Sequence, residues 1–288
     1  MARLILIADD YAISPGVSAG IRALADRKRL TGTGVMATME AWPAEAPALR
    51  DLHERIAVGL HFTLSDQRPL GALKTLAPGG RLPSVGKLVL ASLAGRLPRQ
   101  EIADELERQL DRFERHFGAP PDFIDGHQHV HVLPGVWQVV QGAFGRRLDP
   151  ARCWLRDCCD FHLAGRGQAF KAGLISMLAR GASRAARGRD LRRNRGFSGF
   201  YDYEAGDLAR FFTPMLKEAG DGHAMMVHPG HVDDALRAVD TLTDPREREW
   251  AFLMGADFPA QLAAAGFELA PPGFPVDGGG NSRQTAAP

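Results

Sequence analysis

Short apolar runs alternate with helical patterns along most of this chain, and that order limits the fold more than any other feature. The first run, residues 4–8, is continuous and apolar, and a helical pattern follows it over 17–24. A strand that is apolar on both faces is typical of a parallel sheet with helices on both sides. The same order predicts further strands at 31–39, 56–64, 123–128, 153–156, 223–231 and 267–269. It predicts further helices at 43–52, 98–117, 136–144, 208–219 and 246–265.

The length of 288 residues fits a single α/β barrel. We therefore expect one barrel domain over residues 1–270, with a basic helical insertion around 166–195. Residues 66–97 contain several prolines and glycines and are too long for a simple connection, which indicates a substrate loop. The Gly- and Pro-rich residues 271–288 are expected to be a disordered tail.

Charge, cysteine content and hydropathy exclude several classes of protein. The formal net charge of +1 argues against a bulk polyanion as a partner. The three cysteines, Cys153, Cys158 and Cys159, fall in one short window, which fits reduced thiols in a cytoplasmic protein better than disulfides or a thiolate zinc site. The N-terminus lacks the apolar region of a signal peptide, and no apolar run is long enough to span a bilayer. Any membrane contact is therefore expected to be peripheral, at the inner membrane surface.

The segment 166–195 carries most of the local charge asymmetry. It holds nine lysines and arginines against one acidic residue, Asp190, with leucine, isoleucine and methionine between them. Three interpretations stay open: a solvated helical insertion, an amphipathic arm on anionic lipid or an acidic partner, and a nucleic-acid contact. Because no aromatic stacking platform or nucleic-acid motif accompanies these charges, nucleic acid is not an expected partner.

The densest group of metal-ligand side chains is Asp125-Gly126-His127-Gln128-His129-Val130-His131. If residues 123–128 form a strand, alternation places Asp125, His127 and His129 on one face, with His131 in the loop beyond. Neutral imidazole is the commonest side-chain ligand for zinc, and a neighbouring carboxylate can join the ion or orient a ring. The alternative interpretation is a polar loop with scattered histidines.

Similar polar side chains stand at or just past the ends of other predicted strands: Asp9, Asp10, His61, Arg156 and His228. In a parallel barrel these ends meet at one edge. One carboxylate and two histidines from three strands would make an open site for a divalent ion. A second carboxylate could take a proton from water, and a histidine on the opposite side could protonate the leaving group.

Each of these residues also has a structural interpretation. Asp9 could cap a helix, and His61 could be a core histidine. His228 could be a turn residue before Pro229-Gly230, and Arg156 could pair with a nearby aspartate. His223 and His231 are expected to be structural.

Four motifs together resemble the YdjC-like carbohydrate deacetylases, also called the ChbG/HpnK family. They are Ala8-Asp9-Asp10-Tyr11 with Ser14, residues 59–64 (GLHFTL), residues 125–131 (DGHQHVH) and His228-Pro229-Gly230. The resemblance covers residues 3 to about 269 and is greatest to the HpnK branch, which is associated with hopanoid biosynthesis. One departure is that Tyr11-Ala12 stands where the family commonly has Phe-Gly.

The resemblance implies a distorted barrel related to polysaccharide deacetylases, one divalent metal ion such as zinc or magnesium, and removal of an acetyl group from an N-acetylated amino sugar. The substrate would be an N-acetylglucosamine unit, carried by a hopanoid in the HpnK branch. Residue by residue, it implies Asp10, His61 and His127 as metal ligands, Asp9 as the base, His228 as the general acid, Arg156 as the partner of ionised Asp9, and Asp125, His129 and His131 as supporting or sugar-contacting groups.

Two other functions remain as alternatives. A metal-dependent phosphoesterase could use the same ligands, although no Gly-rich phosphate cradle is apparent. A sugar- or metal-binding module would have the same metal ligands but would catalyse no reaction. The sequence also leaves open whether the chain forms a homodimer.

Overall fold

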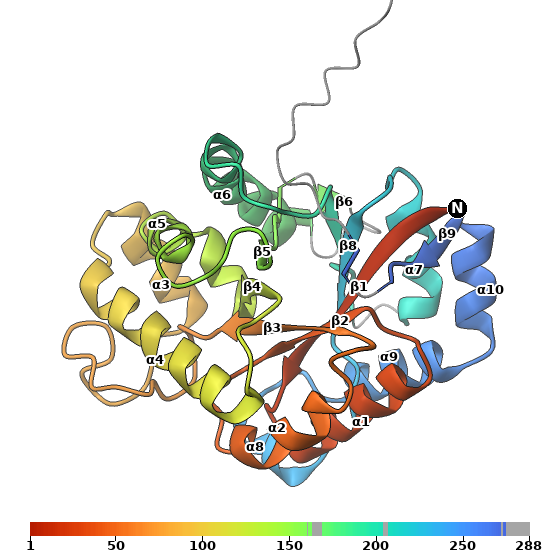
Figure 1. Cartoon of the computed structure of the whole chain (residues 1–288), viewed down its shortest axis with the longest axis horizontal. Helices are drawn as coiled ribbons and strands as arrows, with labels where there is room; N and C mark the ends of the chain where they lie inside the picture. Colours follow the sequence, from red (N-terminus) through yellow and green to blue (C-terminus); the bar gives the residue numbers. More distant parts are fainter. Residues whose placement is uncertain (160, 163–168, 204–206, 272, 275–288) are drawn as a thin grey trace, which may run out of the picture.

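Parallel strands form the centre of the computed structural model, and helices surround them (Figure 1). The structure describes residues 1–159, 161–162, 169–203, 207–271 and 273–274. Within these residues the strands are β1 (Ala2–Tyr11), β2 (Gly32–Val35), β3 (Ala57–Phe62), β4 (Phe123–Gly126), β5 (Trp154–Leu155), β6 (Phe161–His162), β7 (Phe197–Ser198), β8 (His223–Val227) and β9 (Phe267–Leu269).

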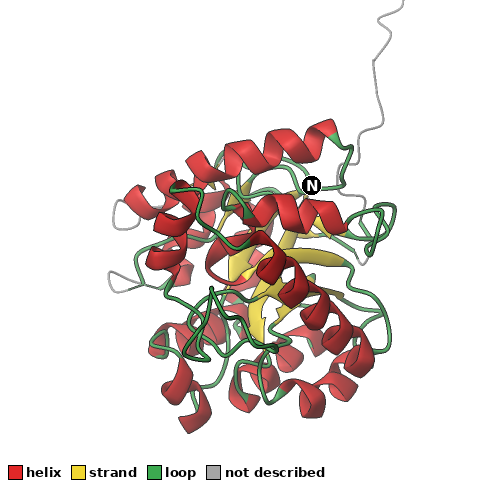
Figure 2. Cartoon of the chain, turned by 90° about the vertical axis from the view of Figure 1, so that its left-hand side faces the viewer, coloured by secondary structure: helices red, strands yellow, loops and turns green. Residues whose placement is uncertain are grey.

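The helices lie outside the sheet in both views (Figures 1 and 2). In the described part they are α1 (Pro15–Asp26), α2 (Trp42–Arg50), α3 (Val85–Leu93), α4 (Arg99–Phe117), η1 (His127–Val132, a 3₁₀ helix), α5 (Val136–Ala143), α6 (Ala169–Gly188), α7 (Leu208–Leu216), α8 (Asp234–Val239), α9 (Asp244–Met254) and α10 (Asp257–Ala264). None of the described helices is long and apolar enough to cross a membrane.

The strand order in the sheet is β5-β4-β3-β2-β1-β8-β7-β6, and β9 pairs with the first residues of β1. Every strand pair in this sheet is parallel. The predicted class, a distorted α/β barrel of parallel strands with surrounding helices, is therefore confirmed. Because the strands are parallel, their carboxyl ends lie at one edge, and the predicted site residues lie in the last residues of the strands or in the segments that follow them.

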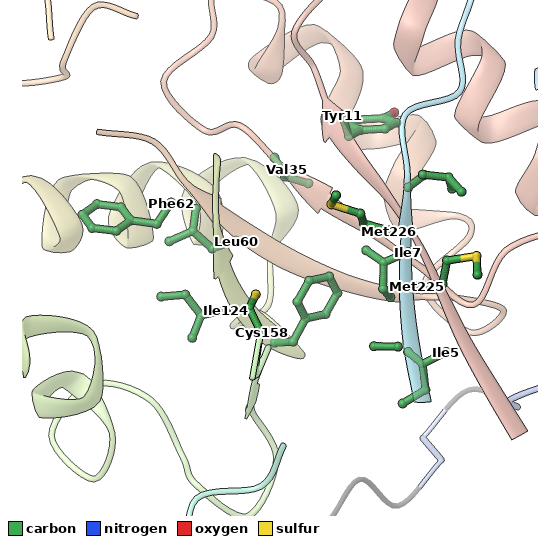
Figure 3. Packing of buried hydrophobic residues seen from close by; sticks show 14 of the residues in the cluster. Ile5, Ile7, Tyr11, Val35, Leu60, Phe62, Ile124, Cys158, Met225 and Met226 are labelled. Carbon is green, nitrogen blue, oxygen red and sulfur yellow. The ribbon is translucent and has the colours of Figure 1, made fainter. Parts of the chain in front are cut away.

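The core is built around β1, whose residues from Leu4 to Tyr11 are buried on both faces. Such a strand needs apolar neighbours on each side, which explains the continuous run at 4–8. Figure 3 shows the side chains that fill this region from β1, β2, β3, β4 and β8, together with Cys158. Burial of each aliphatic side chain stabilises the fold by about 1.5–3 kcal/mol. The packed core therefore stabilises the sheet whose carboxyl edge carries the predicted site residues.

The strand expected at 123–128 ends earlier, at Gly126, and the chain turns into η1. The prediction that Asp125, His127 and His129 share one face by alternation was therefore wrong. Gln128 and His129 have positive φ angles of 51° and 61°, which no extended strand contains. A Cβ on Gly126 would lie 2.9 Å from the backbone nitrogen of His131, so the glycine allows the turn to fold back this closely.

The structure differs from two other expectations, and a third lies partly outside the described residues. The single helix expected at 246–265 is broken at Gly255 into α9 and α10. The excursion at 66–97 contains a helix, α3. The basic segment contains α6, although Arg166 and the tail residues 275–288 lie outside the described residues. The division into one domain and a disordered tail stays a prediction.

Gly59 offers a test of how tightly β3 and β4 pack. A Cβ at Gly59 would lie 2.4 Å from ring carbons of Phe123, so we expect Gly59→Ala to lower the free energy of unfolding by about 1–3 kcal/mol in urea denaturation. Gly142→Ala is the control, because nothing lies within 4 Å of its added Cβ in α5. That change should raise stability by about 0.5–1 kcal/mol. Equal stabilities for the two variants would contradict the packing described.

Candidate metal and catalytic site

Two consecutive aspartates at the end of β1 face the same site. Regular alternation would point Asp9 and Asp10 to opposite faces of the sheet. The pairing of β1 with β2 shifts register between Ala8 and Tyr11, and Asp10 has a φ of 68° in the left-handed region. This irregularity brings carboxylate oxygens of both aspartates within 4.8 Å of a ring nitrogen of His61.

Asp10, His61 and His127 converge although they belong to β1, β3 and η1. The Asp10 Oδ1 atom lies 3.4 Å from His61 Nε2 and 3.0 Å from His127 Nδ1. One ligand atom of each residue lies within 4.8 Å of the others, and all three residues are buried. Two imidazole nitrogens and one carboxylate oxygen form a donor set that suits zinc and tolerates other divalent ions.

The His61 ring is oriented from its other side by Asp125 on β4. Asp125 Oδ1 lies 2.6 Å from His61 Nδ1, which turns Nε2 toward Asp10. Burial acts to lower the pKa of His61, but the negative charges of Asp125 and Asp9 have a larger, opposite effect. The pKa of His61 is therefore raised to about 10. Gly34 on β2 gives the ring room, since a Cβ there would lie 3.0 Å from Nδ1. A carboxylate behind a histidine is the usual support for a metal-ligating ring, so these residues fit a metal ion.

Arg156, just after β5, joins two of the carboxylates. Its two terminal nitrogens contact both oxygens of Asp9, at 2.8 and 2.6 Å. One of them also lies 2.7 Å from Asp125 Oδ2. Burial disfavours the charged guanidinium, but Asp125 and Asp9 outweigh this effect and raise the pKa of Arg156. The fixed fork of an arginine holds a carboxylate in one orientation, so Asp9 is both charge-paired and positioned.

A second buried arginine, Arg246 on α9, holds Asp10 and was missed by the sequence analysis. Its NH2 atom lies 2.6 Å from Asp10 Oδ2 and 2.6 Å from Asp240 Oδ2, and its Nε donates to the carbonyl of Leu242. Burial raises the pKa of Asp10, but Arg246 and His127 lower it more, so that the pKa is well below its usual value. The contact leaves the other oxygen of Asp10 facing the two histidines.

His228 follows β8, and its contacts come from residues that the sequence analysis, as with Arg246, did not single out. Tyr203 Oη lies 3.3 Å from His228 Nδ1, and the backbone N–H of His228 donates to Glu249 on α9. Tyr201 Oη donates to the other oxygen of Glu249 at 2.6 Å. Burial lowers the pKa of His228 to about 4. Gly230 packs so closely on α1 that a Cβ would lie 2.8 Å from the Cα of Val17, which explains the glycine in this motif.

His129 and His131 lie away from the three ligand atoms. His131 Nε2 donates to the backbone carbonyl of Arg156 at 3.0 Å, and burial lowers its pKa to about 4. His129 Nδ1 lies 3.7 Å from the sulfur of Cys158. His131 therefore supports the segment that carries Arg156, whereas Asp125 touches both His61 and Arg156 directly.

A polar cavity of about 390 Å³ reaches the site at His127. Its wall includes Asp66, Gln67 and Arg81 from the predicted substrate loop and Asp240 from the loop before α9. A second cavity of about 480 Å³ shares Gln67 and Arg81 with it, and Arg68 and Arg112 are added to its lining. The space beside His127 is large enough for sugar units, which supply many hydroxyl groups for polar walls.

Comparisons with known proteins identify relatives of the whole chain and a solved structure with the same fold. The chain is 31% identical over 270 residues to a chitooligosaccharide deacetylase of Klebsiella pneumoniae, covering 92% of this chain and 96% of the relative. It is 29% identical over 269 residues to a carbohydrate deacetylase of Geobacillus stearothermophilus, covering 92% and 94%. A crystal structure of a proposed cellobiose-phosphate cleavage protein from Enterococcus faecalis superposes with a TM-score of 0.69 at 21% identity, covering 94% and 97%, and shares the fold. The model of the YdjC-like protein family matches residues 3–264, so the chain belongs to that family.

Proposed function

We propose that this protein is a metal-dependent hydrolase that removes the acetyl group from an N-acetylated amino sugar such as an N-acetylglucosamine unit. The observation that carries the proposal is the convergence of Asp10, His61 and His127 beside the Asp9–Arg156 pair. A ligand set next to a separate, positioned carboxylate is what amide hydrolysis by activated water requires. The names of the relatives, chitooligosaccharide and carbohydrate deacetylases, support an acetylated sugar as the substrate.

In this proposal Asp10, His61 and His127 would hold one divalent ion, with zinc or magnesium as the candidates. A divalent ion bound there would polarise the acetyl carbonyl and lower the pKa of water. Arg246 and Asp125 keep the ligands in place, since each binds the far side of a ligand side chain. His127 also lines the polar cavity, so a substrate in that cavity would lie next to the three side chains.

Asp9 is the proposed base. It takes a proton from the attacking water while the water oxygen bonds to the acetyl carbon. Its two oxygens are bound by Arg156, which keeps the carboxylate from rotating away. The carbon–nitrogen bond then breaks, and the leaving amine must gain a proton.

His228 is the proposed donor of that proton. Tyr203 contacts Nδ1, which leaves Nε2 for the substrate. With a pKa of about 4, few His228 rings carry a proton at pH 7, and a ring that does carry one passes it readily to an amine. The tyrosine and the backbone contact to Glu249 fix the ring's position.

The finer expectations from the sequence stay proposals. We propose that residues 1–270 act as one barrel domain in the cytoplasm, and that the sugar is carried by a hopanoid lipid, as in the HpnK branch. Peripheral membrane contact through 166–195 is a separate proposal that does not depend on the reaction, and a homodimer stays open. Acetate release from a hopanoid-linked N-acetylglucosamine, compared with release from a soluble chitooligosaccharide, tests the lipid carrier.

We expect Asp9→Asn to lower acetate release from N-acetylglucosamine oligosaccharides by about 10²–10⁴-fold, because the amide cannot accept the proton from water. Bound zinc, measured by elemental analysis, should stay unchanged because the three ligands remain. Asp26→Asn, at an exposed carboxylate, is the control and should retain full activity. Retained turnover in Asp9→Asn would contradict the role of base.

His228→Ala should separate acid catalysis from the other steps. With an acetamido sugar the rate should fall by about 10²–10⁴-fold, because the amine leaves only when protonated. With an aryl acetate ester the loss should be below about tenfold, because a phenolate leaves without a proton. Asp9→Asn should slow both reactions. Equal losses on both substrates in His228→Ala would contradict the assignment.

Arg246→Lys should weaken metal binding without removing a ligand. An ammonium group cannot reach Asp10, Asp240 and the Leu242 carbonyl together, so Asp10 loses its fixed orientation. We expect the Kd for zinc, measured by competition with a chromophoric chelator, to rise about 10–100-fold. Arg55→Lys changes an exposed ion pair with Asp26 and is the control. An unchanged Kd in Arg246→Lys would argue against this positioning role.

A further inference from the structure

We call η1, which carries the proposed metal ligand His127, the catalytic turn, and an apolar groove lies beside it. It has a volume of about 460 Å³ and lies between α3 and α6, with η1 as its floor. Its walls are almost entirely aliphatic, from Val85, Val89 and Leu90 on one side to Leu174, Ile175 and Leu178 on the other. Gln128 and His129, the residues after His127, line the same groove. Gln128 also lines the polar cavity, so the two spaces adjoin at this residue.

The helices on either side of the groove carry most of the exposed large apolar side chains in the described part of the chain. Leu90 and Leu93 of α3 are 70% and 57% exposed, and Met177 of α6 is 55% exposed. The fourth such residue is Met1, at the chain start. Leu90 and Leu93 are three residues apart and so share one face of α3. The exposed apolar surface is therefore concentrated around one groove.

The same two helices also carry exposed basic residues and no acidic ones. Lys87 lies in α3, and Arg180 and Arg184 follow Met177 at helical spacing on α6, all of them exposed. The sequences of both helices contain no aspartate or glutamate. Basic residues beside exposed leucine and methionine are the pattern of segments that lie on a bilayer with anionic head groups.

We infer that α3 and α6 together form a docking surface for an anionic lipid bilayer. The apolar side chains enter the acyl region, and Lys87, Arg180 and Arg184 contact the head groups. A second copy of the chain fits less well, because a symmetric contact would bring these cations together. The catalytic turn then stands at the membrane surface. The idea that docking brings a lipid-linked substrate to the site rests on the proposed function. The docking itself does not.

Vesicle sedimentation tests the surface with the full chain. We expect binding to vesicles of phosphatidylcholine mixed with phosphatidylglycerol, and weaker binding to phosphatidylcholine alone or at high salt. Arg180→Ser with Arg184→Ser should lower the partition coefficient by about tenfold or more. Leu93→Ser with Met177→Ser should lower it similarly by removing exposed apolar contacts. Arg27→Ser with Lys217→Ser removes two exposed cations elsewhere and should have little effect.

Several results would overturn the inference. Absence of vesicle binding, or equal binding by all variants, would do so. Binding to polyglutamate without binding to vesicles would assign the surface to an acidic protein. A dimer in light scattering that Leu93→Ser with Met177→Ser converts to a monomer, without vesicle binding, would assign it to a second copy.

Acetate release from a soluble chitooligosaccharide keeps the two proposals separate. All surface variants should retain it, because none of the changed residues contacts the site. Vesicle binding that follows the predicted order in a protein that releases no acetate would leave the docking surface intact and reject the reaction. Acetate release without vesicle binding would support the reaction and reject the docking surface.

Discussion

The site depends on charges that are buried together at the carboxyl edge of the sheet. Asp9, Asp10 and Asp125 are almost completely buried, and among the described residues Arg156 and Arg246 are the permanent cations of similar burial that pair with them. Removing one partner of such a buried pair typically costs about 3–5 kcal/mol, because the other charge stays behind without water. In this group carboxylates exceed arginines by one, and the rings of His61 and His127 lie 3.4 and 3.0 Å from Asp10 Oδ1. The raised pKa of His61 lets a proton offset that surplus, and a divalent ion bound by the same residues would take the place of this proton.

This charge balance joins parts of the chain that are far apart in sequence. Arg246 lies 236 residues from Asp10, and Arg156 lies 147 residues from Asp9. Parallel strands make the contacts possible, because each β-strand delivers its last side chains to the same edge. Helix α9 adds a second connection, since it carries both Arg246 at Asp10 and Glu249 at His228. A shift of that helix would disturb Asp10, the proposed metal ligand, and His228, the proposed acid, together.

The sequence pattern was sufficient to place β1 to β5, β8 and β9, because burial on both faces of strands such as β1 and β3 leaves a continuous apolar run. It missed β6 and β7, which are two residues long and too short to show a period. It was insufficient where the backbone leaves a regular period. The bulge at Asp10 and the left-handed Gln128 and His129 are not encoded by alternation, so the face assigned to His129 was wrong. Arg246, Tyr203 and Glu249 stand outside any ligand-dense motif, and their partners are close only after folding. The helical period also continues through Gly255, which hid the break between α9 and α10.

The irregularity at the end of β1 has a consequence for how the family's sequences can change. Because the chain reverses its usual alternation there, two neighbouring positions supply two different chemical roles, one toward the histidines and one toward Arg156. Insertion or deletion of one residue at this point would exchange or separate those roles even if both aspartates survived. We therefore expect the length of this part of β1, between Ala8 and Tyr11, to be as constrained as the identity of its two aspartates.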